Sequence, residues 1–253
     1  MCVDNWLNNY MDSAIKFFEE NSTFKPSFPK IPNELVTDEE IATWVFKQDI
    51  PYIELDLKFD VSQWLNESKL AEPYLVNHRE SQPHKGWKSC CIHGIDVDKT
   101  GIWNCYAEEE PVYQWTELSE LTPTIKQFWQ QFPFESFARI RFMQVEAGGY
   151  IYPHHDTPPD YDRNSGVLNH LVPINIAIDH PADCYMTLKD HGIVPWQTGD
   201  VKLVNITNYH SVVNFSNQPR MHLIAHGVVG NRFKEFSKLI SDSYKKQYER
   251  SRI

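Results

Sequence analysis

The chain after about residue 80 is a succession of short apolar or alternating segments, and this pattern restricts the possible folds more than any other feature. Turn sequences such as Thr198-Gly199 and the run 216–219 separate several of the segments. The first segment ends at Gly148-Gly149. Many short strands at such spacing predict a sandwich or jelly roll. The expected strands span residues 138–146, 170–178, 183–188, 200–206, 210–215 and 221–229.

Helical patterns lie on both sides of this β-rich part. Residues 117–132 and the amphipathic stretch 232–249 carry apolar residues at helical spacing, as do the residues around Tyr10 and Phe18. Asp38-Glu39-Glu40 supplies acidic residues to the first turn of a further helix. The fold class predicted is therefore mainly β with flanking helices (α+β).

The composition indicates one large domain, since 253 residues with 41% hydrophobic content can bury a substantial core and no flexible linker is evident. We expect a helical N-terminal region over residues 1–75 that packs on the core, a β core over 76–230 and a C-terminal amphipathic helix over 231–253.

The net charge of -10 argues against a nucleic-acid or anionic-membrane partner, because both require clustered basic residues. No apolar run approaches the length of a membrane span, and no signal peptide is visible. The five cysteines show no paired spacing, which favours reduced thiols. These features together predict a cytoplasmic protein.

Three residues have the spacing of a metal site. His154 and Asp156 follow a Gly-rich turn in "GGYIYPHHD", and His210 lies 56 residues after His154 in "NYHSVVN". Residues i and i+2 of a strand point the same way, so His154 and Asp156 can reach one ion. Two imidazoles and one carboxylate form the ligand set of non-haem Fe(II) sites. A His-x-Asp pair or a single histidine is common by chance, and the metal prediction depends on the joint pattern, in which Arg220 also follows His210.

The two blocks "ARIRFMQVEAGGYIYPHHD" and "GDVKLVNITNYHSVVNFSNQPRMHLIAHG" resemble the aspartyl/asparaginyl β-hydroxylase family, which includes bacterial proline hydroxylases. The similarity covers about residues 80–230. It implies a double-stranded β-helix of the jelly-roll, cupin-like type. It also implies an oxygenase that depends on Fe(II), 2-oxoglutarate as cosubstrate and O2.

The resemblance assigns roles to five positions of this chain. His154, Asp156 and His210 would be the iron ligands, and Arg220 would pair with the C5 carboxylate of 2-oxoglutarate. His170 matches a strand histidine near the C1 carboxylate of the cosubstrate, although a buried structural histidine is the alternative.

Three positions refine or depart from the family pattern. Asp156 stands where animal β-hydroxylases lack a carboxylate ligand, so the chain resembles the proline-hydroxylase branch and hydroxylation is favoured over halogenation. Leu168 replaces an arginine that often precedes the strand histidine, and Met143 replaces a serine beside the cosubstrate carboxylate.

Several further residues are candidates for contact with substrate or cosubstrate. Arg139 and Arg141 share strand parity with Met143, so Arg141 can face the pocket and hold a carboxylate, or both arginines can lie on a solvated face. Trp87 and His93 are candidates for the pocket mouth, and Arg163 lies in a loop, 157–167, that can act as a lid. The remaining candidates are Asn205 and Asn208, as supports of His210.

The function predicted is hydroxylation of an aliphatic C–H group in a free amino acid or similar small carboxylated substrate. A protein or peptide side chain (Asp, Asn or Pro) is the second choice and a nucleobase the third. Two rivals belong to other classes: a non-catalytic β-helix module that binds a ligand or metal, and a Zn(II) hydrolase, in which Arg220 has no evident task.

Overall fold

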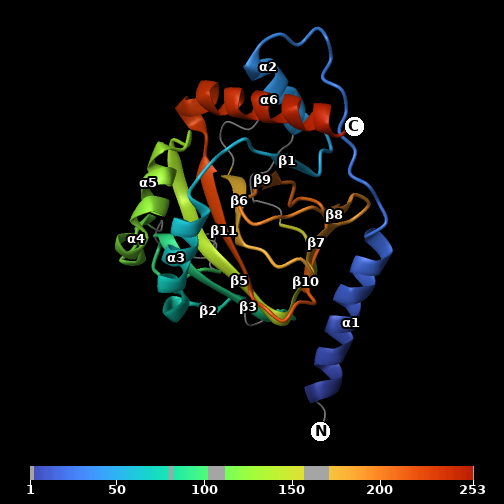
Figure 1. The fold of residues 1–253 in the computed structure, drawn as a ribbon, viewed down its shortest axis with the longest axis vertical. Helices are drawn as coiled ribbons and strands as arrows, with labels where there is room; N and C mark the ends of the chain where they lie inside the picture. The colour runs from blue at the N-terminus through green and yellow to red at the C-terminus, as the bar shows by residue number, and fades with distance from the viewer. Residues whose placement is uncertain (1–2, 80–81, 102–111, 157–170, 253) are drawn as a thin grey trace.

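The computed structural model describes residues 3–79, 82–101, 112–156 and 171–252. Its centre is an antiparallel sheet that curls into a nearly closed barrel with helices around it (Figure 1). The strands follow the order β1-β9-β6-β11-β5-β10-β7-β8, with β3 paired to β5 beside this path. This is the double-stranded β-helix, or jelly roll, that the sequence predicted.

The long strand β5 (Ser136–His154) belongs to both walls of the barrel. Its first half pairs with β11 (Arg220–Val228), and its second half pairs with β10 (His210–Asn214). The strand therefore continues past Gly148, where the sequence predicted its end. Gly148 has φ +66°, a left-handed conformation that glycine adopts without strain, at the point where the partner strand changes.

The remaining strands complete the two walls. One wall continues from β11 through β6 and β9 to β1, a short strand that the N-terminal region contributes. The other continues from β10 through β7 to β8. The bounds are β1 Tyr52–Glu54, β2 Val76–Asn77, β3 Lys85–Gly94, β4 Gln114–Trp115, β6 Leu171–Asp179, β7 Cys184–Leu188, β8 Gly192–Val194 and β9 Val201–Val204.

Helices flank the barrel on three sides (Figure 1). They are α1 Val3–Asn21, α2 Asp38–Lys47, α3 Val61–Ala71, α4 Leu118–Leu121, α5 Pro123–Gln131 and α6 Phe233–Arg250, with short 3-10 turns at Glu72–Tyr74 and Gly230–Arg232. α2 begins with a capping box in which Thr37 and Glu40 bond to each other's backbone N–H groups. The helix expected over 117–132 is divided, because Pro123 begins α5 after the short α4.

Alternation along the strands separates an apolar outer face from a more polar interior. Phe142 of β5 and Leu223 of β11 point outward and belong to the large core under the helices, which includes Trp129 and Phe236. The intervening residues, such as Arg141, face the inside of the barrel and line its pocket. None of the described helices combines the length and the hydropathy that crossing a lipid bilayer requires.

Candidate metal centre

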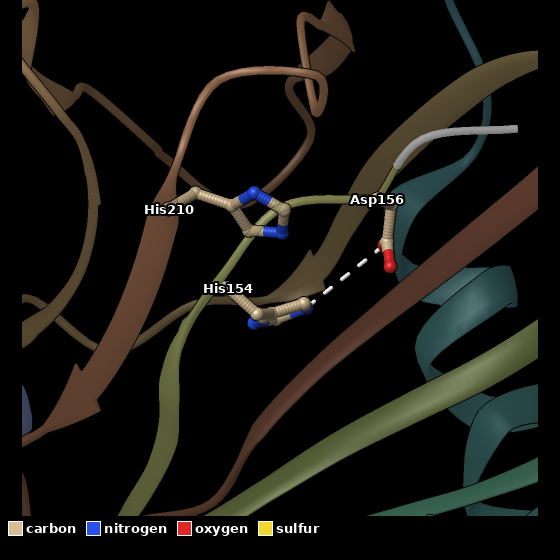
Figure 2. A group of neighbouring side chains, drawn as sticks. All are labelled: His154, Asp156 and His210. Carbon is tan, nitrogen blue, oxygen red and sulfur yellow. Dashed lines mark ion pairs between the residues drawn. The ribbon is translucent and has the colours of Figure 1, made fainter.

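The three predicted ligands come together at one end of the barrel. His154 is the last residue of β5, His210 is the first residue of β10, and the two are paired across the strands. Asp156 follows two residues after His154, and its backbone N–H donates to the carbonyl oxygen of Ile206. Figure 2 shows both imidazoles and the carboxylate directed toward a common space.

The geometry of this group suits a metal ion. One ligand atom from each of His154, Asp156 and His210 lies within 4.8 Å of the others, and no other such group occurs among the residues that the structure describes. Nε2 of His154 is 3.9 Å from Oδ2 of Asp156. The two imidazole centroids are 4.3 Å apart. Two nitrogens and one oxygen are the donors of a non-haem Fe(II) site with open positions.

Backbone carbonyl groups orient both imidazoles. Nδ1 of His154 lies 2.8 Å from the carbonyl oxygen of Tyr152, and Nδ1 of His210 lies 3.0 Å from that of Asn208. A carbonyl oxygen only accepts, so each neutral ring carries its proton on Nδ1 and leaves Nε2 bare. A partner of this kind also fixes the ring orientation of metal-binding histidines.

The protonation of the ligands favours metal binding as well. Burial lowers the pKa of His210 to about 4, and burial also lowers the pKa of His154. Burial tends to raise the pKa of Asp156, but His210, Arg79 and His154 outweigh this effect and lower it below its usual value. All three groups are thus in the form that binds a cation at neutral pH.

The triad lines one end of a pocket in the interior of the barrel. Besides the triad, the wall is formed mainly by apolar side chains and by a few basic or polar ones: His78, Arg79, Trp87, Arg141, Met143, Ile151, Pro173, Asn175, Met186, Val204, Ile206, Val212, Arg220, Ile224 and His226.

Arg220, predicted to hold the cosubstrate, begins β11 and lines this pocket. Only 2% of the residue is exposed, and its Nε atom has no hydrogen-bond partner among the described residues. Burial lowers its pKa from the usual value. A buried guanidinium without a counter-ion is costly, and none of the described residues supplies one to Arg220, so the site suits an anionic ligand.

Arg139 and Arg141 are both buried, and the alternative of a solvated strand face is wrong. Each donates a hydrogen bond from Nη1 to the carbonyl oxygen of Thr100, at 3.2 Å and 2.5 Å. Arg141 lines the pocket, and its Nε atom has no described partner. Burial lowers the pKa of Arg141 to about 10, which still leaves it charged at neutral pH.

The other candidates have mixed outcomes. Trp87 lines the pocket, whereas His93 does not: it packs on Trp115 with Nδ1 3.4 Å from the carbonyl oxygen of Ala138. The side chains of Asn205 and Asn208 turn to Asp49, so the support of His210 comes from the backbone of Asn208 instead. The predictions for His170, Arg163, Leu168 and the loop 157–167 lie outside the described residues.

Several pocket residues were not predicted from the sequence. Arg79 donates a hydrogen bond to Oδ1 of Asp156 at 3.3 Å, and its guanidinium lies 5.7 Å from the ring centroid of Trp87. Asn175 and His226 line the pocket from β6 and β11. The parity of Arg220 along its strand was the available signal for His226, but nothing in the sequence alone connects Arg79 with Asp156.

Comparison with solved structures finds proteins of related shape at low sequence identity. A Pseudomonas putida prolyl-4-hydroxylase is 14% identical, with a TM-score of 0.41, and the match covers 70% of this chain and 92% of that one. A 2OG-Fe(II) family oxidoreductase from Burkholderia pseudomallei is 14% identical, with a TM-score of 0.46 and coverage of 80% and 96%. These similarities are too distant to transfer a substrate or a residue role.

A Trichoplax adhaerens prolyl hydroxylase, solved with a peptide fragment of hypoxia inducible factor, is 10% identical, with a TM-score of 0.45 and coverage of 79% and 94%. A search of curated proteins finds no match. The sequence model described as Aspartyl/Asparaginyl beta-hydroxylase matches residues 56–228, which is more than half of the chain and contains the triad and Arg220. The chain therefore belongs to the aspartyl/asparaginyl β-hydroxylase family, oxygenases that use Fe(II), 2-oxoglutarate and O2.

Proposed function

We propose that the protein hydroxylates an aliphatic C–H group of a free amino acid or a similar small carboxylated molecule. His154, Asp156 and His210 would hold Fe(II), and Arg220 would hold the far carboxylate of 2-oxoglutarate. The observation that carries the proposal is that one pocket contains both the three-ligand group and a buried arginine for which no described residue supplies a counter-ion.

The triad and the residues around it would have different roles in such a reaction. His154, Asp156 and His210 would hold Fe(II), which with 2-oxoglutarate would supply O2 activation: one oxygen atom would enter the substrate C–H bond and the other succinate, with release of CO2. The guanidinium of Arg220 can donate two parallel hydrogen bonds to one carboxylate, which would orient the cosubstrate. Apolar residues such as Met186, Val212 and Ile151 exclude water from the same space.

The position of Arg141 supports the proposal that the substrate carries a carboxylate. It is 5% exposed and reaches the pocket from β5, so its charge is available only to a group that enters the pocket. Arg220 begins β11 beside Val145, whereas Arg141 lies beside Ile224, four positions further along β11. The two arginines therefore occupy different levels of the barrel, and one cosubstrate does not account for both.

A protein or peptide side chain is the second candidate substrate. An acidic side chain can also deliver a carboxylate, but the enclosed position of Arg141 favours a small molecule that enters as a whole. We further propose that His170 lies near the cosubstrate, as the resemblance predicts. Cytoplasmic location and the lack of a nucleic-acid partner remain predictions from the composition.

The test is turnover of the purified protein with Fe(II), 2-oxoglutarate and a panel of amino acids and peptides. We expect succinate together with a product heavier by one oxygen atom. The His210→Ala variant should form no succinate above background, and N-oxalylglycine should inhibit the wild type. Succinate formation by His210→Ala at the wild-type rate would refute the proposal. Activity that survives with Zn(II) and without 2-oxoglutarate would indicate the hydrolase instead, and binding without turnover would indicate a non-catalytic module.

A further inference from the structure

A series of hydrogen-bonded polar groups leads from the pocket to the turn between β6 and β7. Asn175 lines the pocket, and the amide atom assigned as its Oδ1 lies 2.8 Å from Nδ1 of His222. Nε2 of His222 lies 2.8 Å from Nδ1 of His180, and Nε2 of His180 lies 2.9 Å from the carbonyl oxygen of Cys184. His222 is fully buried and Asn175 is 8% exposed.

The positions of the protons on His180 and His222 decide the orientation of the Asn175 amide. The carbonyl oxygen of Cys184 only accepts, so His180 carries its proton on Nε2 and its Nδ1 is bare. His222 must then donate from Nε2, which leaves its own Nδ1 bare. That bare nitrogen needs a donor, and Asn175 can supply one only from its NH2 group.

If Asn175 instead presented its carbonyl oxygen to His222, one of the two imidazoles would need an additional proton. Burial lowers the pKa of His180 to about 4 and the pKa of His222 well below its usual value, and Arg220 and Lys202 act in the same direction on His222. Trp196 is an uncharged aromatic neighbour of both rings. Two neutral rings are therefore favoured.

The NH2 group of Asn175 then faces His222, and the carbonyl oxygen becomes the end of the amide that faces the pocket. No carboxylate fits beside this oxygen, because two acceptors repel each other. The register places Asn175 and Arg141 on either side of Ile224, in one row across three adjacent strands. At about 4.8 Å between strands, the two side chains can reach opposite ends of one small molecule.

We propose that Asn175 is a specificity-determining residue that accepts a hydrogen bond from the ammonium group of the substrate, while Arg141 holds its carboxylate. The inference rests on the proposed function and deepens it, since it selects a free α-amino acid over a peptide residue or a des-amino acid. His180 and His222 are positioning residues that hold the amide in this orientation.

The first test reads the imidazole protons directly. Long-range 1H–15N NMR spectra of the ligand-free protein should show both His180 and His222 protonated on Nε2 alone. A proton on Nδ1 of His222 would overturn the proposal, whether or not Nε2 is also protonated. This measurement needs no catalysis, so it gives an answer even if the proposed function fails.

The second test compares common amino acids with their N-acetyl forms as stimulators of 2-oxoglutarate turnover. At least one free amino acid should stimulate turnover about tenfold to a hundredfold more than its N-acetyl form, as expected for a hydrogen bond to a charged group. Equal stimulation, or stimulation by N-acetyl forms alone, would overturn this inference and leave the oxygenase function intact. Absence of any turnover would instead count against the proposed function.

Two substitutions of Asn175 with side chains of similar size test whether the oxygen that faces the pocket, and not the size of the side chain, sets the preference. Asn175→Leu should abolish the preference for the free amino acid. Asn175→Asp should keep the preference, and the NMR spectrum should show His222 protonated on both nitrogens, because a carboxylate oxygen now faces Nδ1. The matched control is Asn231→Asp, an exposed amide outside the pocket, which should change neither readout. A preference that survives in Asn175→Leu would contradict the proposal.

Discussion

The guanidinium of Arg79 lies 3.3 Å from Oδ1 of Asp156, although 77 residues separate them in the chain. The side chains are 17% and 27% exposed, so the pair is partly shielded from water. Arg79 thereby holds the only carboxylate of the triad in position from outside the His-x-Asp motif. Its charge also lowers the pKa of Asp156, next after that of His210, and together with His210 and His154 it outweighs burial, which raises that pKa.

Metal affinity should depend weakly on pH in the mildly acidic range. Protons compete with the metal for each ligand, and a lowered pKa keeps the ligand atom bare to a lower pH. We expect the affinity for Mn(II), measured by calorimetry, to fall by less than about tenfold between pH 7.5 and 5.5. Two histidines of ordinary pKa would reduce it by about a hundredfold over that range, and such a loss would contradict the lowered values.

Replacing Arg220 should have opposite effects on stability and on cosubstrate binding. Arg220→Met removes a buried charge without a described partner. The free energy of unfolding of the ligand-free protein should therefore rise by about 1 kcal/mol or more. The variant should lose the rise in Tm that N-oxalylglycine gives to the Mn(II)-loaded wild type. Retention of that rise would show that the anion binds elsewhere, and unchanged Mn(II) affinity is the control.

Arg141 should act on the substrate and not on the cosubstrate. In Arg141→Gln, the KM of the best panel substrate should rise by about tenfold or more, because a charge-assisted bond is lost in a shielded pocket. The slow 2-oxoglutarate turnover without substrate should persist. Arg232→Gln is the control, since Arg232 pairs with Glu235 at the surface, away from the pocket. An equal loss of both turnovers would place Arg141 at the cosubstrate instead.

The mainly β fold and the grouping of the triad could be predicted because both depend on local patterns, whereas the specific β-helix came from the resemblance to a known family. Alternation and turn residues mark the strands, and the spacing of His154 and Asp156 follows from strand geometry. The position of His210 at the start of a strand was also recognisable from the apolar residues that follow it. The continuation of β5 beyond Gly148 was missed, since a glycine pair is typical of a turn as well as of a strand that changes partners.

The rest of the pocket depends on register, which a single sequence does not define. Asn175 faces Ile224, and Ile224 faces Arg141, only because β11 pairs with both neighbours at particular offsets. Regular pairing from Trp87 to Cys91 would place His93 beside Arg139, yet an irregularity between Cys91 and His93 places it beside Ile140, which belongs to the outer face. The contact of Arg79 with Asp156 joins a segment before β3 to the end of β5, and no periodicity signals it.

The two glycines at the middle of β5 should respond differently to substitution. A Cβ atom on Gly149 would lie 2.7 Å from the carbonyl oxygen of Lys85 and 2.8 Å from that of Glu146, and neither backbone group can move freely. Gly149→Ala should therefore destabilise the protein by about 2 kcal/mol or more in urea unfolding. Gly148 has open space around it and only its φ of +66° restricts it, so Gly148→Asn should cost about 1 kcal/mol or less. Because β5 carries His154 at its end, Gly149→Ala should also weaken Mn(II) binding, whereas Gly148→Asn should not. Equal losses of stability in the two variants would mean that crowding by the β3 backbone is not what requires glycine at position 149.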